Sequence, residues 1–444
     1  MLDINNFTWI LAAVIVFFTF LKWYVARNDD YWKKKGIPYL PRMSLLTMHR
    51  MLKREGTAPF IKSLCNSNLG RVYGGFEGAD PIVIVTEPDL LRDILVKDFH
   101  IFPNRRMMET GDTVADSALN NLTGEQWKRI RTIITPAFTS KRMRVMGSII
   151  NDCSKTVLEM CEKRSEEGKP VDCKGLFGAF TMDVIANSAF GTQIDSQNDP
   201  NNEFVTRVRR VFEGFNFTTM LLAFALPVWI WKFLPSSFHP LKFDRDDFFR
   251  DVTRNVIKKR KETGRRYNDF LQILMDAADE TRHAEHLDLA EDETDRFGSI
   301  VNDGLSPSLK YKKLSETELL AQCVLFFLVG YETTATMITF TAYSLAVNPD
   351  CQEKLIKEID EAFQKHGEMS HDAVREMKVL DAVISETLRM HPPLGSLERT
   401  AVEKYELRNT GIVVEKGMRV GIPTYGIHYD PEFFEDPETF NPER

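Results

Sequence analysis

Residues 319–347 read LLAQCVLFFLVGYETTATMITFTAYSLAV, and this stretch decides how the rest of the chain is interpreted. Its length and apolar character predict a helix that is buried on nearly every side. Gly330, Glu332, Thr333 and Thr334 stand in its middle, where a carboxylate and two hydroxyls cost free energy unless they find partners. Two interpretations stay open: a functional site, or a core helix whose threonines bond back to the preceding turn and whose Glu332 meets an arginine elsewhere.

Gly330 is a second anomaly in the same stretch. A glycine inside a helix costs about 1 kcal/mol relative to alanine. We therefore expect that something flat or small approaches the backbone at this position.

Two further stretches narrow the choice. Residues 382–393, AVISETLRMHPP, place Glu386 and Arg389 one helical turn apart among apolar neighbours, and the two prolines end the helix. Such pairs are common on surfaces, but the apolar neighbours predict burial. Residues 440–444 read FNPER. In this order the three stretches resemble the Gly-x-Glu-Thr-Thr helix, the Glu-x-x-Arg helix and the Phe-x-Pro-Glu-Arg meander of the cytochrome P450 family.

The resemblance implies a mainly α fold with small β-sheets, formed by one haem-thiolate monooxygenase domain over residues 46–444. It implies a haem b cofactor and a reaction that inserts one oxygen atom from O2 into a lipophilic small molecule such as a xenobiotic, steroid or fatty acid. Electrons would come from NADPH through cytochrome P450 reductase, with cytochrome b5 as a further partner. Glu332 and Thr333, beside the notch at Gly330, would deliver protons.

Other residues match the family's cofactor-binding and structural positions. Trp127 and Arg131, at i and i+4, resemble the Trp-x-x-x-Arg pair that holds a haem propionate, and Arg399 stands where the family has its other propionate-binding arginine. Without the resemblance, Trp127 and Arg131 would be interpreted as a surface pair. Glu386, Arg389 and Arg444 would form the network that locks the family fold.

The cysteine that binds the haem iron is not among the matched motifs. In the family it follows the meander, inside Phe-x-x-Gly-x-Arg-x-Cys-x-Gly, and this sequence ends at Arg444. Cys173 precedes a lysine and a glycine, but the Phe, Gly and Arg of the motif are absent, so we interpret that match as coincidental. We expect the domain to be C-terminally truncated, with its metal ligand beyond Arg444, and to be inactive as given. Val329 stands where the family more often has Ala or Gly, and we expect its bulkier side chain to restrict substrate approach.

The N-terminal residues predict a membrane anchor. Residues 7–21 carry no charge, a helix over residues 7–25 would be about as long as a bilayer core is thick, and basic residues follow it. The expected anchor occupies residues 1–26. A cleaved signal peptide is the competing interpretation. We expect a single-pass anchor in the endoplasmic reticulum membrane, a basic and proline-containing hinge at 27–45, and a cytosolic catalytic domain.

Composition excludes several other classes. The net charge of -7 with scattered basic residues gives no reason to expect nucleic acid as a partner. The six cysteines lack disulfide or zinc spacing and predict reduced thiols. Residues 276–313, which contain His283 and His286, predict a surface insertion rather than a metal site, and the apolar residues 212–234 resemble the family's membrane-facing lid.

Two alternatives to an active enzyme stay open. The first is a non-catalytic, membrane-anchored isoform that keeps the scaffold and modulates the reductase. The second is a product that never folds, because apolar surfaces remain exposed. Sequence downstream of Arg444 separates the enzyme from the first alternative, and protease resistance separates the first from the second.

Overall fold

The computed structural model describes residues 22–65, 68–107, 112–191, 194–199, 201–213, 247–267, 269–278 and 313–444, together with residues 9, 12, 15, 16, 19 and 20. The described residues divide into two compact units that interleave along the chain. The sheet unit takes its described residues from Met1–Arg106 and Leu394–Phe433. The helical unit takes them from Met107–Phe215, Lys242–Pro393 and Phe434–Arg444.

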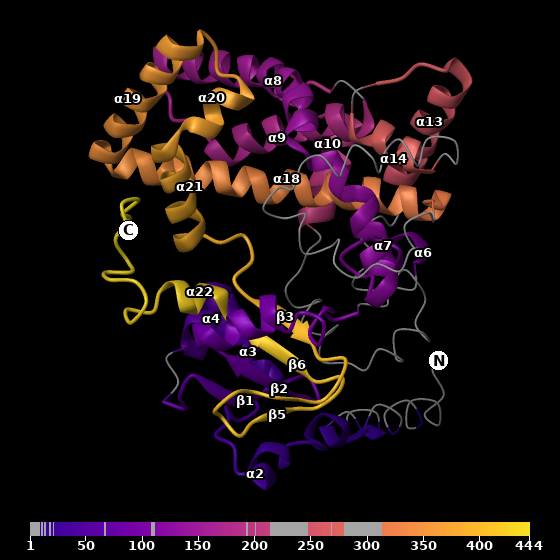
Figure 1. Cartoon of the computed structure of the whole chain (residues 1–444), viewed down its shortest axis with the longest axis vertical. Helices are drawn as coiled ribbons and strands as arrows, with labels where there is room; N and C mark the ends of the chain where they lie inside the picture. The colour runs from indigo at the N-terminus through magenta and orange to yellow at the C-terminus, as the bar shows by residue number, and fades with distance from the viewer. Residues whose placement is uncertain are drawn as a thin grey trace. The chain divides into compact units, whose positions relative to one another are not determined.

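The sheet unit contains a four-stranded sheet in the order β1-β2-β6-β3 and a two-stranded sheet of β4 and β5 (Figure 1). β1 and β2 form an antiparallel hairpin, β6 runs parallel to β2, and β3 runs antiparallel to β6. The strands are β1 Val72–Glu77, β2 Asp80–Val85, β3 Leu397–Thr400, β4 Tyr405–Glu406, β5 Val413–Val414 and β6 Arg419–Ile422. The helices of this unit are α2 Tyr31–Lys35, α3 Leu45–Glu55, α4 Thr57–Cys65, α5 Pro88–Arg92, the π-helix η1 Asp93–Lys97 and α22 Thr424–His428.

Trp32 attaches the segment before the sheet to β1. Its side chain is fully buried, and its indole N–H donates to the carbonyl of Gly75 at 2.9 Å. The ring lies so close to Gly74 that a Cβ atom there would stand 2.4 Å from it, which explains the glycine. Tyr39 also pairs with Gly74 as a β-bridge. Part of the expected hinge at residues 27–45 is therefore folded into the sheet unit.

The helical unit is built around α18, Glu316–Val347, which runs through it in orange in Figure 1 with α9 against it. A capping box starts α18, because Ser315 accepts from the Glu318 N–H while the Glu318 carboxylate accepts from the Ser315 N–H. The other helices are α6 Thr113–Asp116, α7 Gly124–Ile134, the 3-10 helix η2 Thr135–Phe138, α8 Ser140–Glu166, α9 Cys173–Phe190, α10 Glu203–Glu213, α13 Phe248–Thr263, α14 Phe270–Ala278, α19 Pro349–His366, α20 His371–Glu376 and α21 Lys378–Met390.

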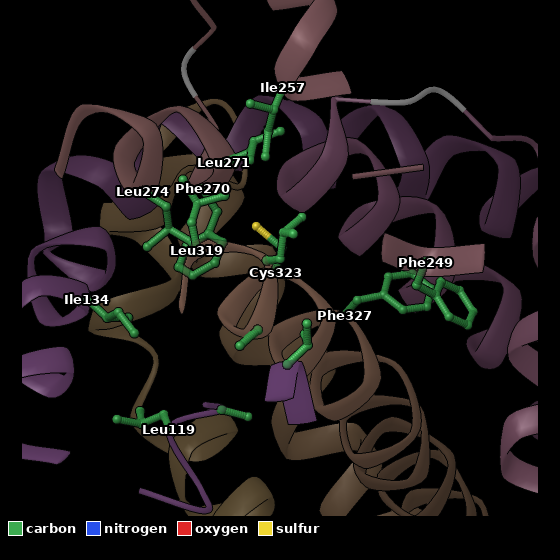
Figure 2. Close-up of a cluster of buried hydrophobic side chains, with 14 of the residues drawn as sticks. Leu119, Ile134, Phe249, Ile257, Phe270, Leu271, Leu274, Leu319, Cys323 and Phe327 are labelled. Atoms are coloured by element: carbon green, nitrogen blue, oxygen red, sulfur yellow. The ribbon is translucent and has the colours of Figure 1, made fainter. Parts of the chain in front are cut away.

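The core of the helical unit gathers around the first half of α18. Leu319, Cys323 and Phe327 of α18 meet Phe249 of α13 and Phe270 of α14, and all five are buried (Figure 2). Leu319, Cys323 and Phe327 recur every four residues along α18, and this spacing puts them on one face of the helix. Burying a large apolar side chain stabilises a fold by about 1.5–3 kcal/mol.

The second half of α18 does not fulfil the expectation of burial on nearly every side. Tyr343 and Val347 are each more than half exposed, and Val329, just before the middle of the helix, is 50% exposed. Within the described part of the chain, α18 is the one helix long and apolar enough to cross a membrane, but α9, α6, α13, α14 and α21 pack against it. The prediction was wrong because it assumed one environment along the helix, whereas the apolar partners of α18 surround mainly its N-terminal half.

Three expected segments lie wholly or largely outside the described residues. These are the N-terminal anchor at residues 1–26, the lid at 212–234 and the charged insertion at 276–313. They stay predictions.

Asp183 of α9 is a buried carboxylate that holds the chain after α9. It accepts a hydrogen bond of 2.9 Å from the backbone N–H of Ser196. Burial raises the pKa of Asp183 to about 6, with a further increase from the nearby Asp195 and an opposing effect of the Ser196 hydrogen bonds. The folded state therefore binds more protons than the unfolded state between pH 3.8 and about 6, and stability falls as the pH rises through that window.

We predict that Asp183→Asn stabilises the protein at pH 7.5. Asn keeps an oxygen that accepts from Ser196 but carries no charge to bury. The gain should reach up to about 3 kcal/mol above pH 6 and vanish toward pH 4. Thermal unfolding of both proteins across this pH range measures it. Asp195→Asn, an exposed neighbour, is the matched control and should give a smaller gain. A constant difference between Asp183→Asn and wild type at all pH values would contradict the prediction.

Candidate functional site

The central residues of α18 are partly exposed to solvent. The Glu332 carboxylate is 33% exposed and lies 3.4 Å from the Nζ of Lys174 on α9. The Thr333 hydroxyl donates to the carbonyl of Val329 at 2.6 Å, while Val329 itself is 50% exposed. The back-bonding expected for a threonine in a core helix is therefore present at Thr333. The partner of Glu332 is a lysine instead of the arginine that this interpretation anticipated.

Gly330 is explained by helix packing. A Cβ atom at this position would stand 2.8 Å from Cδ1 of Ile185 on α9. Thr181, one turn earlier on α9, donates its hydroxyl to the carbonyl of Tyr331 at 3.1 Å. The small or flat group that we expected to approach Gly330 is thus a neighbouring helix in the described chain.

Trp127 and Arg131 lie on α7 within the helical unit. They are one turn apart on the same helix and are both half-buried. Ile130, Ile133 and Ile134 of the same helix are buried in the core, and Trp127 packs against that core cluster. The indole N–H is a neutral donor and the guanidinium is a charged donor, and both suit a carboxylate.

Arg399 lies on β3 within the sheet unit, beside a second arginine. Its guanidinium donates to the carbonyl of Glu398 at 2.8 Å. Burial lowers the pKa of Arg399, and the nearby positive charge of Arg105 lowers it further. The carboxylate of Glu398 acts in the opposite direction on the pKa of Arg399, but no carboxylate among the described residues forms an ion pair with Arg399. Arg105 was missed in the sequence, where the Arg105-Arg106 doublet was its signal.

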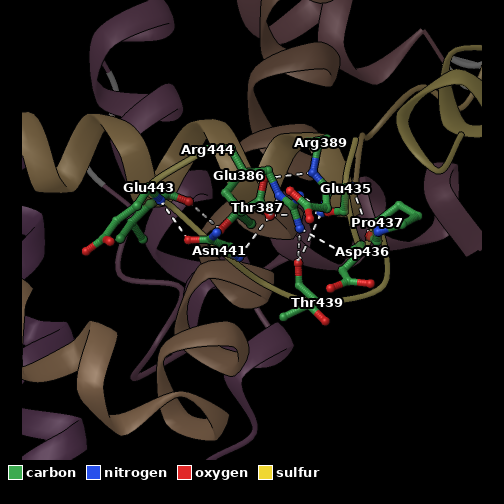
Figure 3. Close-up of polar contacts among 11 residues, drawn as sticks. Glu386, Thr387, Arg389, Glu435, Asp436, Pro437, Thr439, Asn441, Glu443 and Arg444 are labelled. Carbon is green, nitrogen blue, oxygen red and sulfur yellow. Dashed lines mark hydrogen bonds and ion pairs between the residues drawn. The ribbon is translucent and has the colours of Figure 1, made fainter. Parts of the chain in front are cut away.

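The structure brings Glu386, Arg389 and Arg444 together at the end of the helical unit (Figure 3). Glu386 accepts from Arg389 at 2.7 and 2.8 Å, from Arg444 at 3.0 Å and from the backbone N–H of Asn441 at 2.9 Å. The two arginines also donate to backbone carbonyls of residues 435–439: Arg389 to Pro437 and Thr439, and Arg444 to Glu435, Asp436 and Thr439.

Hydrogen bonding decides the charge state of Glu386. Burial acts against its ionisation, but the bonds from Arg389, from the Asn441 N–H and from Arg444 outweigh burial and hold its pKa below the usual value. Both Glu386 and Arg389 are almost completely buried. A buried ion pair of this kind is stable only when its remaining donors and acceptors are satisfied, as they are here.

None of the six cysteines is disulfide-bonded in the structure, and the reduced state of the thiols stays a prediction. Burial raises the pKa of the thiols of Cys65 and Cys323 to about 12 and that of Cys153 to about 11, and it also raises the pKa of Cys161. These four environments disfavour a thiolate. Cys173 is the first residue of α9 and is followed by Lys174, so it does not stand in the loop that the family motif requires.

The described residues combine a mainly helical fold with small sheets, a Glu-x-x-Arg helix tied to residues 435–444 and a polar break in a central apolar helix. This combination fits the class of protein that the motifs predicted. The family model described as Cytochrome P450 matches residues 38–444. The chain belongs to the cytochrome P450 family, whose members are oxidoreductases that act as monooxygenases.

The chain is similar to several curated members of the family from animals. It is 34% identical to cytochrome P450 3A5 of Homo sapiens and 34% identical to cytochrome P450 3A9 of Rattus norvegicus. It is 32% identical to cytochrome P450 3A11 of Mus musculus. Each alignment covers 98% of this chain and 81% of the relative.

Several of these features suit the haem that the family implies. Arg399 has no ion-pair partner among the described residues, so Arg399 and the nearby Arg105 suit a haem propionate. Trp127 and Arg131 offer a second set of donors. The uncovered side chain of Val329 in an apolar helix suits a flat apolar ligand.

We predict that Glu386→Ala costs about 3–5 kcal/mol of folding free energy, because it leaves Arg389 charged and buried without its carboxylate. Urea unfolding followed by circular dichroism measures the change. Glu376→Ala on α20 is the matched control, since it removes an exposed partner of Lys365 and should cost far less folding free energy. Equal unfolding midpoints for the two variants would contradict a structural role of the network.

We predict that Gly330→Ala destabilises the protein by about 1 kcal/mol or more, because the new methyl group meets Ile185. Ile185→Val shortens that side chain and should recover most of the loss when the two changes are combined. A double-mutant cycle on thermal unfolding measures the coupling. If the two effects simply add, the contact with Ile185 does not explain the glycine.

Proposed function

We propose that the gene product is a microsomal monooxygenase that inserts one oxygen atom from O2 into a lipophilic small molecule. Membership of the family over residues 38–444 supports this proposal. The strongest structural support is the solvent-exposed middle of α18, where Glu332 and Thr333 lie close to the exposed Val329. An apolar wall next to a carboxylate and a hydroxyl suits an oxidation of an apolar compound that consumes protons.

Glu332 and Thr333 are the proposed proton carriers. Thr333 holds its proton in a 2.6 Å bond to the Val329 carbonyl, so it must leave that bond to donate elsewhere. Glu332 is one residue earlier and partly in contact with water, which lets its carboxylate exchange protons with solvent. The proposed relay therefore passes from water to Glu332 and from Glu332 to the hydroxyl of Thr333.

The remaining site residues have holding roles. Trp127, Arg131 and Arg399 would hold the haem propionates, and we add Arg105 to this set because of its position beside Arg399. When bound, the haem supplies oxygen activation and electron storage. Glu386, Arg389 and Arg444 would fix the meander before the iron ligand, because the two arginines donate to the carbonyls of Glu435, Asp436, Pro437 and Thr439 there.

Substrates and partners follow from the relatives. The named relatives are cytochromes P450 of animals, and we propose a similar range of xenobiotics, steroids or fatty acids. We also propose electron supply from NADPH through cytochrome P450 reductase, with cytochrome b5 as an additional partner. An N-terminal helix within residues 1–26 would anchor the enzyme in the endoplasmic reticulum membrane.

The thiolate ligand gives the first test. Reading the transcript past the codon for Arg444 should show a continuing frame that encodes Phe-x-x-Gly-x-Arg-x-Cys-x-Gly. The product that contains this motif should give a thiolate-type reduced carbonyl spectrum, and residues 1–444 alone should not. Such a spectrum from residues 1–444 would refute the assignment of the ligand. A stop codon directly after Arg444 would favour the non-catalytic alternative instead.

We predict that Thr333→Ala in the catalytically competent form uncouples NADPH consumption from product. Product formed per NADPH consumed should fall about tenfold or more, because a positioned proton donor is lost. Thr339→Ala is the matched control, since Thr339 lies on the same helix and makes the same kind of bond, 2.7 Å to the Ala335 carbonyl. Unchanged coupling in Thr333→Ala would remove its role in the relay.

A further inference from the structure

One face of α9 packs against the part of α18 that contains the proposed proton carriers. Lys174, Gly178, Thr181 and Ile185 follow one another at intervals of four, three and four residues, which places them along one side of the helix. Ile185 touches Gly330 and Thr181 bonds to the backbone of Tyr331, as described above. At the start of the same face, Lys174 reaches the carboxylate of Glu332.

The small residues on this face fix where Lys174 lies. A Cβ atom at Gly178 would stand 3.4 Å from the hydroxyl oxygen of Tyr331, so the two helices are in close contact there. Because α9 is held by Ile185, Thr181 and Gly178 in succession, the first turn of α9 has little freedom relative to α18. This packing fixes the backbone of Lys174 at a position from which its amine reaches Glu332.

Lys174 and Glu332 have no other side-chain partners within the described residues. The Lys174 side chain is 75% exposed and that of Glu332 is 33% exposed, so the pair stands where water meets the side of α18. Thr333, the next residue, directs its hydroxyl back to Val329. The carboxylate is therefore held outward on the water side while the hydroxyl is held by the helix.

We propose that Lys174 is the positioning residue for Glu332 and that protons enter the relay from water at the start of α9. This inference rests on the function proposed above. By holding the carboxylate at the solvent edge in one place, Lys174 keeps Glu332 in contact with bulk water and within reach of its neighbour Thr333. The expected effect is modest, because exposed ion pairs shift an equilibrium by about two- to fivefold.

The contact itself is tested without any activity measurement. A water-soluble carbodiimide joins an amine and a carboxylate that touch, forming an amide bond and taking up the water as a urea. In the full chain, mass spectrometry should find Lys174 joined to Glu332 and, as an internal control, Lys365 joined to Glu376. Lys174→Gln should lose the first product only, and Lys365→Gln the second only. Absence of the first product in wild type beside a clear second product overturns the proposal.

The positioning role is tested in the haem-loaded enzyme. Lys174→Gln should lower product formed per NADPH by about two- to fivefold and increase the solvent deuterium isotope effect on turnover, because the supply of protons becomes less efficient. Lys174→Arg should restore both, since it keeps the positive charge. Lys365→Gln should change neither.

The outcomes separate the two proposals. If wild type turns over and Lys174→Gln matches it in coupling and isotope effect, the positioning role is wrong while the proposed function stands. If wild type binds haem through a thiolate and no lipophilic substrate is oxidised, the proposed function fails and takes the positioning role with it. A loss in Lys174→Gln that Lys174→Arg does not recover would assign the lysine to structure and overturn the proposal.

Discussion

The end of the helical unit depends on one ionised carboxylate, that of Glu386. Removing a carboxylate from water is costly, and only two guanidinium groups and a backbone N–H together outweigh this cost. The same guanidinium groups satisfy carbonyls over residues 435–439, which belong to no helix or strand. Residues 435–439 thereby adopt one defined backbone conformation without regular secondary structure. Their carbonyl groups accept hydrogen bonds from the side chains of Arg389 on α21 and of Arg444.

The contact between α9 and α18 serves structure and chemistry at once. Gly330 and Gly178 allow the two helices to approach, and the hydroxyl of Thr181 bonds to a main-chain carbonyl inside α18. Close approach at these points is what brings a charged residue of α9 beside Glu332. The glycine that the family motif associates with the reaction is thus also required by the packing of this chain.

The sequence predicted the fold class and the elements whose signals are local. The apolar periodicity, the prolines that end α21 and the run of β-branched residues in β2 each act within a few residues. It did not predict the uneven burial of α18, the lysine partner of Glu332 or the proximity of Arg105 to Arg399. These depend on which distant segments meet, and a helical pattern alone does not contain that information. Trp32 shows the same limit, because its burial against Gly74 joins a segment that had been interpreted as a hinge.

The order of strands in the sheet unit has a consequence for biosynthesis. β2 ends at Val85, but its parallel neighbour β6 begins only at Arg419, so one edge of β2 has no partner until 334 further residues have been made. At about 5–20 residues per second, a ribosome needs roughly 17 to 67 s for that interval. During this time the nascent hairpin of β1 and β2 presents an apolar strand edge of the kind that promotes aggregation. This edge of β2 therefore stays open to other chains until β6 has been synthesised.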